Sequence, residues 1–453
     1  NSEPVQPTLW HDYGQFCLRT NMVDKAEECF REELQLPSAR ESSSFDTLLA
    51  LAGVLLTQSK TPKGNKYLLD QAEVLLHTAL RQQEGGEDNS PAGGEQKEQA
   101  PAGSANTSLC WAMLALLYSK TKGLNSDACQ NCVFKAAQEK RQISMGNATI
   151  EVDGMTHLVF CLLDLSLPQV AADALAICES ISPLDSLLCK VQTHYLLREY
   201  SEASEVLAEV FELCEHDDVR PFVLQGKIHY KMGNFQGAIG SFTHVMSINA
   251  SACTLDVLLI YGKALLHVGT EGSVKTALDV FVFACQKCPC ASTWLGCAQC
   301  CIYLEDFANA EIALTEASVL DAKNAKVWAY TCILSLKVGR FGVAESALEF
   351  VLLENLEDAT LLNVIAKELA ACSMHRQAAQ VLRKSLGVAS SGETLKLLGD
   401  SLFLLGSKLE AKTLYDNLLS EHGSDIGSET SEAVRKQIES INLEFGLAAV
   451  PAA

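Results

Sequence analysis

The stretch STWLGCAQCCIYLEDFANAEIALTEA, residues 292–317, decides the fold of this chain. Its apolar residues fall three and four positions apart in two sets: Trp294, Ala298 and Cys301, then Ala310, Leu314 and Ala317. Such spacings place side chains on one face of an α-helix. The stretch therefore predicts two antiparallel helices that meet through these faces, with small residues at the crossing where the backbones approach closely.

The same frame recurs along the chain, so that a small residue is followed twelve positions later by Ala and, four positions further on, by a bulky residue. Further copies are Gly226/Ala238/Phe242, Cys332/Ala344/Leu348, Ala366/Ala378/Leu382 and Gly399/Ala411/Tyr415. The N-terminal segment repeats the pattern with Trp10, Gly14, Cys17, Ala26 and Phe30. A period near 34 residues indicates a stack of helical hairpins, each of which buries its apolar face against the next.

This frame resembles the tetratricopeptide-repeat superfamily. The resemblance implies an all-α solenoid of helix-turn-helix repeats, wound into a right-handed superhelix and ended by a C-terminal capping helix. We expect Gly233, Gly339 and Gly406 to lie in turns within hairpins, and Pro289 to follow the end of a second helix. The bulky residues Phe242, Phe281, Trp328 and Tyr415 are expected to fill the space between hairpins.

Composition divides the chain into six segments. We predict N-terminal repeat hairpins over 1–81, a disordered acidic Gly/Glu-rich insertion over 82–107, a repeat hairpin over 108–138, a linker over 139–153, the main repeat array over 154–420, and a capping helix and tail over 421–453. The insertion has no aromatic residue and too little apolar surface to order itself. The capping helix is expected to turn Ile438, Ile441 and Leu443 inward.

The charge balance narrows the possible partners. Lys and Arg number 35 against 56 Asp and Glu, a formal charge of −21, which repels nucleic acids and anionic membranes and favours basic protein partners. The run LLALAGVLL at 48–56 is too short to span a bilayer. The chain begins at Asn1 without a signal sequence, so we expect a part of a longer protein, with its 18 cysteines in a reducing compartment such as the cytoplasm.

A search for chemistry predicts no catalytic, cofactor-binding or metal-binding residue and no cofactor. Cysteines are the strongest metal candidates, and they cluster at Cys285, Cys288, Cys290, Cys297, Cys300 and Cys301, with a second pair at Cys129 and Cys132. The repeat frame places several of them at core positions, where small buried thiols are expected instead of zinc ligands. The ten histidines are scattered, and no GxxxxGK phosphate loop occurs.

Tetratricopeptide arrays bind peptides in a groove lined by their first helices, and one subgroup clamps a terminal carboxylate there with Lys, Asn and Arg. The corresponding positions here carry His11 and Gln15 in the first repeat and Val223 and Lys227 in a later one. This set differs from the clamp, so a carboxylate clamp is not expected. The residues that contact a partner stay unknown at this stage.

A closer resemblance is carried by the segments 9–34 and 288–340, above all by the strings TWLG, AEIAL, NAKVWAY and LKVGR. They are similar to the C-terminal repeat half of the cilia- and flagella-associated protein 70 family. The resemblance implies a non-enzymatic structural component of the axoneme, the cytoskeletal core of cilia and flagella, that supports ciliary motility. Expected partners are central-apparatus or dynein-arm proteins.

Microtubules are acidic, so direct docking of this chain on them is not expected.

Two other interpretations of the function stay open. A general cytosolic tetratricopeptide adaptor, in transport or in a ubiquitin-ligase complex, would have the same fold and exchange its partners. An enzyme would require a metal in the cysteine-rich hairpins.

Overall fold

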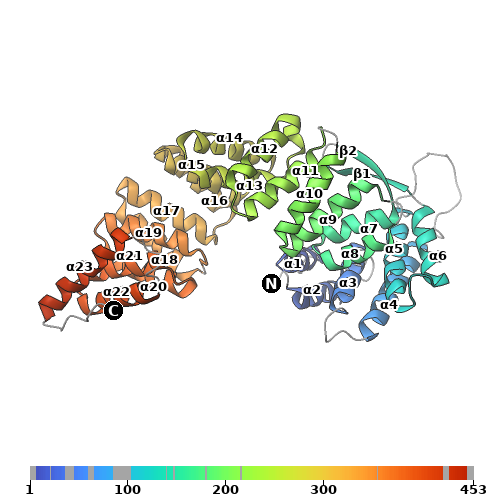
Figure 1. The fold of residues 1–453 in the computed structure, drawn as a ribbon, viewed down its shortest axis with the longest axis horizontal. Coiled ribbons are helices and arrows are strands. Elements are labelled where there is room, and N and C mark those ends of the chain that lie inside the picture. Colours follow the sequence, from blue (N-terminus) through green and yellow to red (C-terminus); the bar gives the residue numbers. More distant parts are fainter. Residues whose placement is uncertain are drawn as a thin grey trace, which may run out of the picture. The chain divides into compact units, whose positions relative to one another are not determined.

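A computed structural model describes residues 7–20, 22–35, 45–59, 66–84, 104–138, 140–145, 148–178, 181–214, 217–354, 356–421 and 428–445. The chain divides into two compact units, residues 1–257 and 258–453, and each is described by itself. Helices follow one another in antiparallel pairs through both units (Figure 1). This arrangement confirms the all-α tetratricopeptide solenoid predicted from the repeat.

The first unit holds six hairpins. Their helices are α1 (Pro7–Arg19), α2 (Val23–Gln35), α3 (Phe45–Gln58), α4 (Lys66–Glu84), α5 (Ser104–Thr121), α6 (Asp127–Gln138), α7 (Gly154–Asp164), α8 (Pro168–Ile177), α9 (Pro183–Leu197), α10 (Tyr200–Leu213), α11 (Val219–Lys231) and α12 (Phe235–Asn249). Strands β1 (Lys140–Met145) and β2 (Ala148–Asp153) lie between α6 and α7, and a 3₁₀ turn, Ala250–Ala252, follows α12.

The division between the units falls inside α13 (Leu255–Val268). The second unit continues with α14 (Glu271–Lys287), α15 (Ala291–Tyr303), α16 (Phe307–Leu320), α17 (Ala325–Val338), α18 (Phe341–Leu353), α19 (Ala359–Ala371), α20 (His375–Val388), α21 (Gly392–Leu404), α22 (Lys408–Glu421) and α23 (Ser428–Phe445). Each odd-numbered helix from α15 to α21 packs on the helix that follows it.

Local sequence sets where these helices begin and end. At the start of α17 the side-chain oxygen of Asn324 accepts the N–H of Lys326 at 3.1 Å, which satisfies one of the donors left open at a helix N-terminus. Gly339 ends the same helix with φ of 81°, a left-handed conformation that glycine adopts without a Cβ clash. Gly233 and Gly406 also have positive φ, so the three predicted turn glycines are confirmed.

In several hairpins the core is an aromatic ring laid over a glycine. Phe242 of α12 is fully buried, and a Cβ added to Gly226 of α11 would lie 2.5 Å from its ring. The same contact joins Gly14 to Phe30 and Gly399 to Tyr415. Because both residues belong to one hairpin, these rings close the helix crossing within each hairpin; the expected packing of Phe242 and Tyr415 between hairpins stays a prediction.

Phe281 and Trp328 depart from that scheme in different ways. Phe281 of α14 covers Gly262 of its own hairpin and also Gly296 at the start of the next, so it does reach between repeats. Trp328 is only half-buried and stacks on Phe350 at 4.6 Å between ring centroids. Trp328 also lines a cleft with residues of α16 in the preceding hairpin, and its expected packing between hairpins stays a prediction.

Two predicted boundaries change. Residues 82–84 belong to α4 and 104–107 to α5, so helix replaces both ends of the predicted insertion, while 85–103 lie outside the described residues. The predicted linker at 139–153 contains an antiparallel hairpin that pairs Lys140 with Asp153 and Met145 with Ala148. Strand β2 packs on α6 and α7, so this segment is attached to the neighbouring helices and is not a simple linker as predicted.

The helix expected to cap the array is α23, which packs on α22. Ile441 is fully buried as predicted, and Val434 is buried with it, two helical turns earlier. Leu443, which we expected to face inward, is 85% exposed, because a residue two positions from Ile441 points to the opposite side of a helix. The predicted tail beyond Phe445 lies outside the described residues.

The glycine crossing can be tested with two alanine substitutions in one hairpin. Gly226→Ala places a Cβ against the ring of Phe242 and should lower the free energy of unfolding by about 1–3 kcal/mol. Gly240→Ala, in α12 with nothing within 4 Å of its Cβ, should raise it by up to about 1 kcal/mol through helix propensity. Urea unfolding midpoints of the two variants measure the difference, and equal shifts would contradict the packing described above.

Candidate peptide-binding groove

A groove of about 740 Å³ runs along the first unit. It is lined by first helices of successive hairpins, namely α7, α9, α11 and the first residues of α13, with Arg19 from the end of α1. Side chains of α8, α10 and α12, the second helices of these hairpins, do not line it. This is the surface on which a tetratricopeptide array presents side chains to an extended peptide or a helix.

The groove has an apolar lining with polar groups at intervals. Its apolar part includes Phe160, Leu163, Leu188, Val219, Val223 and Leu224. Tyr195 of α9 adds an aromatic ring, and burial, followed by the nearby Asp256, raises the pKa of its hydroxyl to about 12, so it stays a neutral hydrogen-bonding group. Such a mixture of apolar contact area and a few fixed polar groups is typical of ligand-binding clefts.

An ion cluster centred on Arg220 joins α9 to α11. Its guanidinium donates to Asp185 of α9 at 2.6 Å and to Asp218, the residue before α11, at 2.8 Å. Asp218 also accepts the backbone N–H of Arg220 at 2.9 Å and so caps α11. Each of the three side chains is at most 16% exposed. The cluster therefore fixes how two neighbouring hairpins stack beneath the groove.

A second ion pair joins the next two hairpins. Lys227 of α11 lies 2.7 Å from Asp256 of α13. At the other end of the groove, the surrounding walls desolvate Asp164 and raise its pKa, and the nearby Arg19 partly offsets that effect. In total the lining carries three basic and three acidic side chains. The groove is therefore balanced in charge, although the chain as a whole has a net charge of −21.

The groove positions inferred from the repeat frame are confirmed for the later repeat, since Val223 and Lys227 both line the groove. His11 and Gln15 do not. The ring of His11 hydrogen-bonds Thr47 of α3 at 3.0 Å and lies 3.4 Å from the buried carboxylate of Glu33. Gln15 of the same helix hydrogen-bonds His11 at 2.9 Å and so supports the ring that joins α1 to α2 and α3.

The cysteines singled out in the sequence are mostly buried. Cys129, Cys132, Cys297, Cys300 and Cys301 are buried, and burial raises the pKa of Cys300 to about 12 and that of Cys132 to about 11. Thiols of this kind stay protonated and are poor nucleophiles and metal ligands. Across the part of the chain that the structure describes, no group of three or more His, Cys, Asp or Glu side chains is placed to hold a metal ion.

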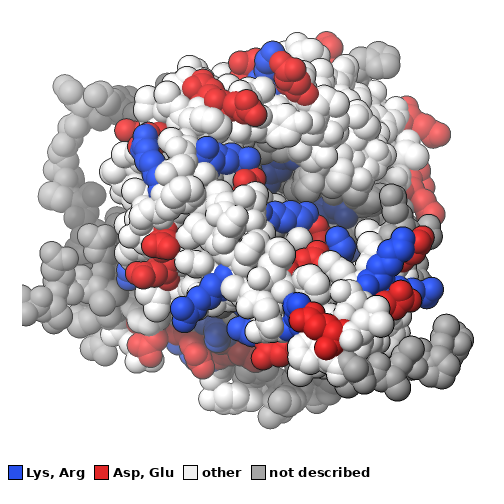
Figure 2. Space-filling view, turned by 90° about the vertical axis from the view of Figure 1, so that its left-hand side faces the viewer, with Lys and Arg blue, Asp and Glu red and all other residues white. Residues whose placement is uncertain are grey.

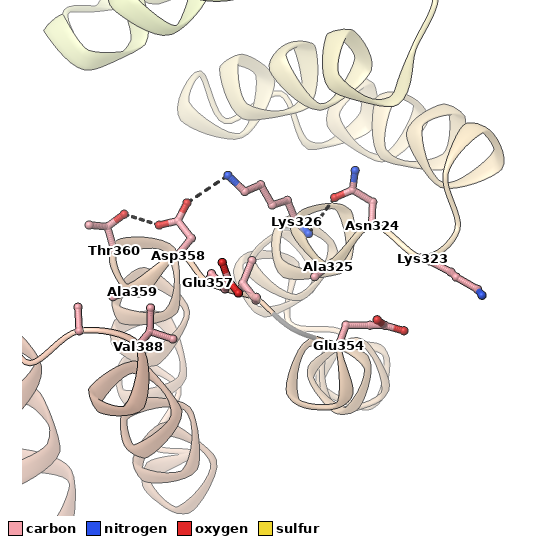
Figure 3. A pocket seen from close by; sticks show the side chains of 12 residues that line it. Lys323, Asn324, Ala325, Lys326, Glu354, Glu357, Asp358, Ala359, Thr360 and Val388 are labelled. Carbon is pink, nitrogen blue, oxygen red and sulfur yellow. Dashed lines mark hydrogen bonds and ion pairs between the residues drawn. The ribbon is translucent and has the colours of Figure 1, made fainter. Parts of the chain in front are cut away.

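A pocket of about 770 Å³ lies in the second unit between the N-terminal ends of α17 and α19 and the C-terminal ends of α18 and α20. Figure 3 shows Lys326 and Asp358 reaching toward each other, at 3.3 Å, while Lys323 points away from the pair. Thr360 donates to Asp358 at 2.6 Å, and Asn324 caps α17. Lys326, Asp358 and Thr360 already satisfy one another, so this pocket is a weaker candidate than the groove.

Charges of both signs are mixed on the face at the left of Figure 1, and Figure 2 shows no large area of one sign on it.

None of the described helices combines the length and the apolar character that crossing a membrane requires.

Comparison with known proteins gives two family matches. The cilia and flagella-associated protein 70 C-terminal domain matches residues 169–437, and the cilia and flagella-associated protein 70 middle TPR-like domain matches residues 2–140. The human cilia- and flagella-associated protein 70 is 25% identical over 451 residues, which cover 80% of this chain and 39% of that protein. The protein of the same name from Macaca fascicularis is 40% identical over 92 residues, 20% of this chain and 9% of that protein.

Among solved structures, a tetratricopeptide repeat protein from Parabacteroides merdae is 16% identical, with a TM-score of 0.45, and covers 56% of this chain and 98% of its own. The chain spans less than half of the human relative.

Paired helices and a groove lined by first helices define a tetratricopeptide-repeat scaffold for protein–protein interaction. Since the C-terminal domain alone matches more than half of its 453 residues, the chain belongs to the cilia- and flagella-associated protein 70 family.

The ion cluster beneath the groove predicts unequal effects of removing two arginines. Arg220→Met leaves two largely buried carboxylates without their partner and should lower the free energy of unfolding of the first unit by about 2–3 kcal/mol. Arg383→Met removes an exposed pair with Glu410 in the second unit. This substitution should change the free energy of unfolding of that unit by less than about 0.5 kcal/mol. Hydrogen exchange of α9 and α11 reports the first effect directly, and similar losses in both variants would refute the assignment.

Proposed function

We propose that this chain is a non-enzymatic scaffold of the ciliary or flagellar axoneme that supports motility by holding a segment of a neighbouring protein in the groove of α7, α9 and α11. The observation that carries this proposal is the groove itself. Its ion pairs join the helices that form it, so its shape is set before a partner arrives. A preformed site loses less entropy on binding than one that must order itself.

The groove favours a partner segment with mixed character. Its apolar side chains offer contact area, while Gln192 and Tyr195 offer hydrogen-bonding groups to a backbone or a polar side chain. Because acidic and basic residues are equal in number there, the proposed segment is recognised by shape and apolar contact more than by net charge. A lone acidic terminus would meet Asp164, Asp185 and Asp256 as well as the basic residues.

The ciliary part of the proposal is supported by the family and by the printed names of the relatives. We infer axonemal partners, such as central-apparatus or dynein-arm components, and a place in the cytoskeleton of the cilium. The net charge of −21 opposes direct docking of this chain on acidic microtubules, so attachment to the lattice is assigned to partners or to other segments of the protein.

The test is a charge placed in the groove of the tagged full-length protein in ciliated cells. Val223→Arg fills the groove with a long cation and should remove crosslinks between the first helices and axonemal proteins. Ser204→Arg, on the exposed face of the second helix α10, adds the same side chain outside the groove and should leave those crosslinks intact. Crosslinking mass spectrometry on isolated axonemes measures the crosslinks of both variants.

Other outcomes separate the parts of the proposal. Crosslinks to soluble cytosolic complexes alone, lost by salt extraction, would transfer the function to a general adaptor in transport or ubiquitin ligation. Crosslinks that persist equally in Val223→Arg and Ser204→Arg would show that the partner does not bind in the groove. The assignment of the chain to its family would not change.

A further inference from the structure

The solvent-exposed faces of α16 and α18, two successive second helices of the second unit, are unusually apolar. Ile312 and Val319 of α16 are 58% and 75% exposed, and Phe350 and Leu353 of α18 are 46% and 82% exposed. Scattered exposed apolar residues are normal, but these lie on two helices whose residues line one cleft, and exposed apolar surface gathered in this way marks an interaction surface. This surface, here called the α16–α18 face, is separate from the groove in the first unit.

A cleft of about 150 Å³ lies between the two helices. Leu314 of α16 and Val343 of α18 form its walls, and Trp328, Leu334 and Val338 of α17 contribute to its lining. The ring of Trp328 is held by its stacking on Phe350 and by a hydrogen bond from its Nε1 to the carbonyl of Ala322 at 2.8 Å. A cavity of this size accepts one large apolar side chain.

Both helices of the face carry acidic residues alone, and the basic residue beside them, Arg340, is paired. The only charged residues of α16 are Glu311 and Glu316, and those of α18 are Glu345 and Glu349. Arg340, just before α18, pairs with Glu311 at 2.6 Å and closes one end of the cleft. Within the described residues, no Lys, Arg or His pairs with Glu316 or Glu349 in this structure. The other second helices of the unit, α14, α20 and α22, all carry basic residues.

The α16–α18 face also has room for a partner helix to approach its backbone closely. Gly342 of α18 has nothing within 4 Å of the place where its Cβ would be, and Ser346 lies one turn further along. Small residues one turn apart let a second helix lie near the backbone of the first.

We propose that the α16–α18 face binds an amphipathic helix of a partner protein, with one large apolar side chain in the Trp328 cleft and with Lys or Arg on the flanks of its apolar stripe. Charge complementarity selects this occupant, because acidic residues border an apolar surface that holds no unpaired base. An anionic membrane is repelled by the same acids. This docking does not depend on the groove of the first unit.

A second copy of this chain is a poorer fit. On its most basic second helix, α20, Arg376 is exposed, whereas Arg383 already pairs with Glu410 and Lys384 already donates hydrogen bonds to the carbonyls of Val351, Leu352 and Glu354. The two paired side chains would have to leave their partners before they could meet Glu316 or Glu349.

The probe is a synthetic helix of about 18 residues, roughly five turns, with Leu along one stripe and Lys on both flanks. A matched peptide has Glu in place of every Lys. Fluorescence anisotropy with the whole chain should show binding of the Lys peptide that weakens as salt rises, and no binding of the Glu peptide. Failure of the Lys peptide to bind, or equal binding of both peptides, would overturn the proposal.

Two variants locate the bound peptide. Val343→Arg and Glu349→Lys should each weaken binding of the Lys peptide by about tenfold, equivalent to about 1.4 kcal/mol. Leu409→Arg and Glu421→Lys, exposed positions of α22, are the matched controls and should change it by less than about twofold. Equal losses in variants and controls would show unspecific attraction to an acidic chain and would overturn the proposal.

Two further measurements separate the remaining explanations. Val223→Arg in the groove should leave binding of the Lys peptide unchanged, so the two sites can fail independently. Sedimentation of the chain without peptide should show a monomer; a dimer that Val343→Arg dissociates would assign the face to a second copy and overturn the proposed partner.

Discussion

The clearest hairpins of this chain depend on the close crossing of their two helices, where an aromatic ring lies on a glycine. Phe242 on Gly226 and Tyr415 on Gly399 fill the volume that a side chain on the first helix would need. The contact buries the whole ring and fixes the register of one helix along the other. Once that register is fixed, the remaining faces of the helices are free to differ between repeats.

The two kinds of helix then take different roles. First helices are joined to one another by ion pairs across successive hairpins, as in Lys227–Asp256, Lys326–Asp358 and Lys337–Glu368. Exposed pairs of this kind contribute little stability individually, but opposite charges favour one neighbour arrangement over others. They also engage basic residues of the first helices. Between α16 and α18 the pair of Arg340 with Glu311 is the cross-hairpin contact, and Glu316 and Glu349 form no ion pair within the described residues.

Sequence reasoning found what the repeat period controls. Ala310 and Leu314 are buried as their spacing predicts, and Val223 and Lys227 lie in the groove because the frame assigns them to a first helix facing it. His11 fits the same frame but points elsewhere, since Glu33 and Thr47, on the next two helices, bind its ring. A contact among three helices cannot be derived from the spacing along one.

Features outside the period were missed for local reasons. The hairpin of β1 and β2 was not predicted, although Gly146 and Asn147, between two runs of β-forming residues, are a recognised two-residue turn signal. The α16–α18 face was missed because the repeat frame follows only the buried side of each helix, and Ile312, two positions before Leu314, falls on the opposite side. Its lack of basic residues, by contrast, can be read directly from the printed sequence.

Net charge describes this chain poorly because the charge is unevenly placed. Six charged residues balance in the groove, whereas the four on α16 and α18 are all acidic. Salt screens attraction to an uncompensated acidic surface much more than it weakens apolar contact in a balanced cleft. The two surfaces therefore recognise partners by different physics: a partner in the groove should stay bound under salt conditions that release a basic helix from the α16–α18 face. A scaffold built in this way can hold one neighbour permanently and exchange another.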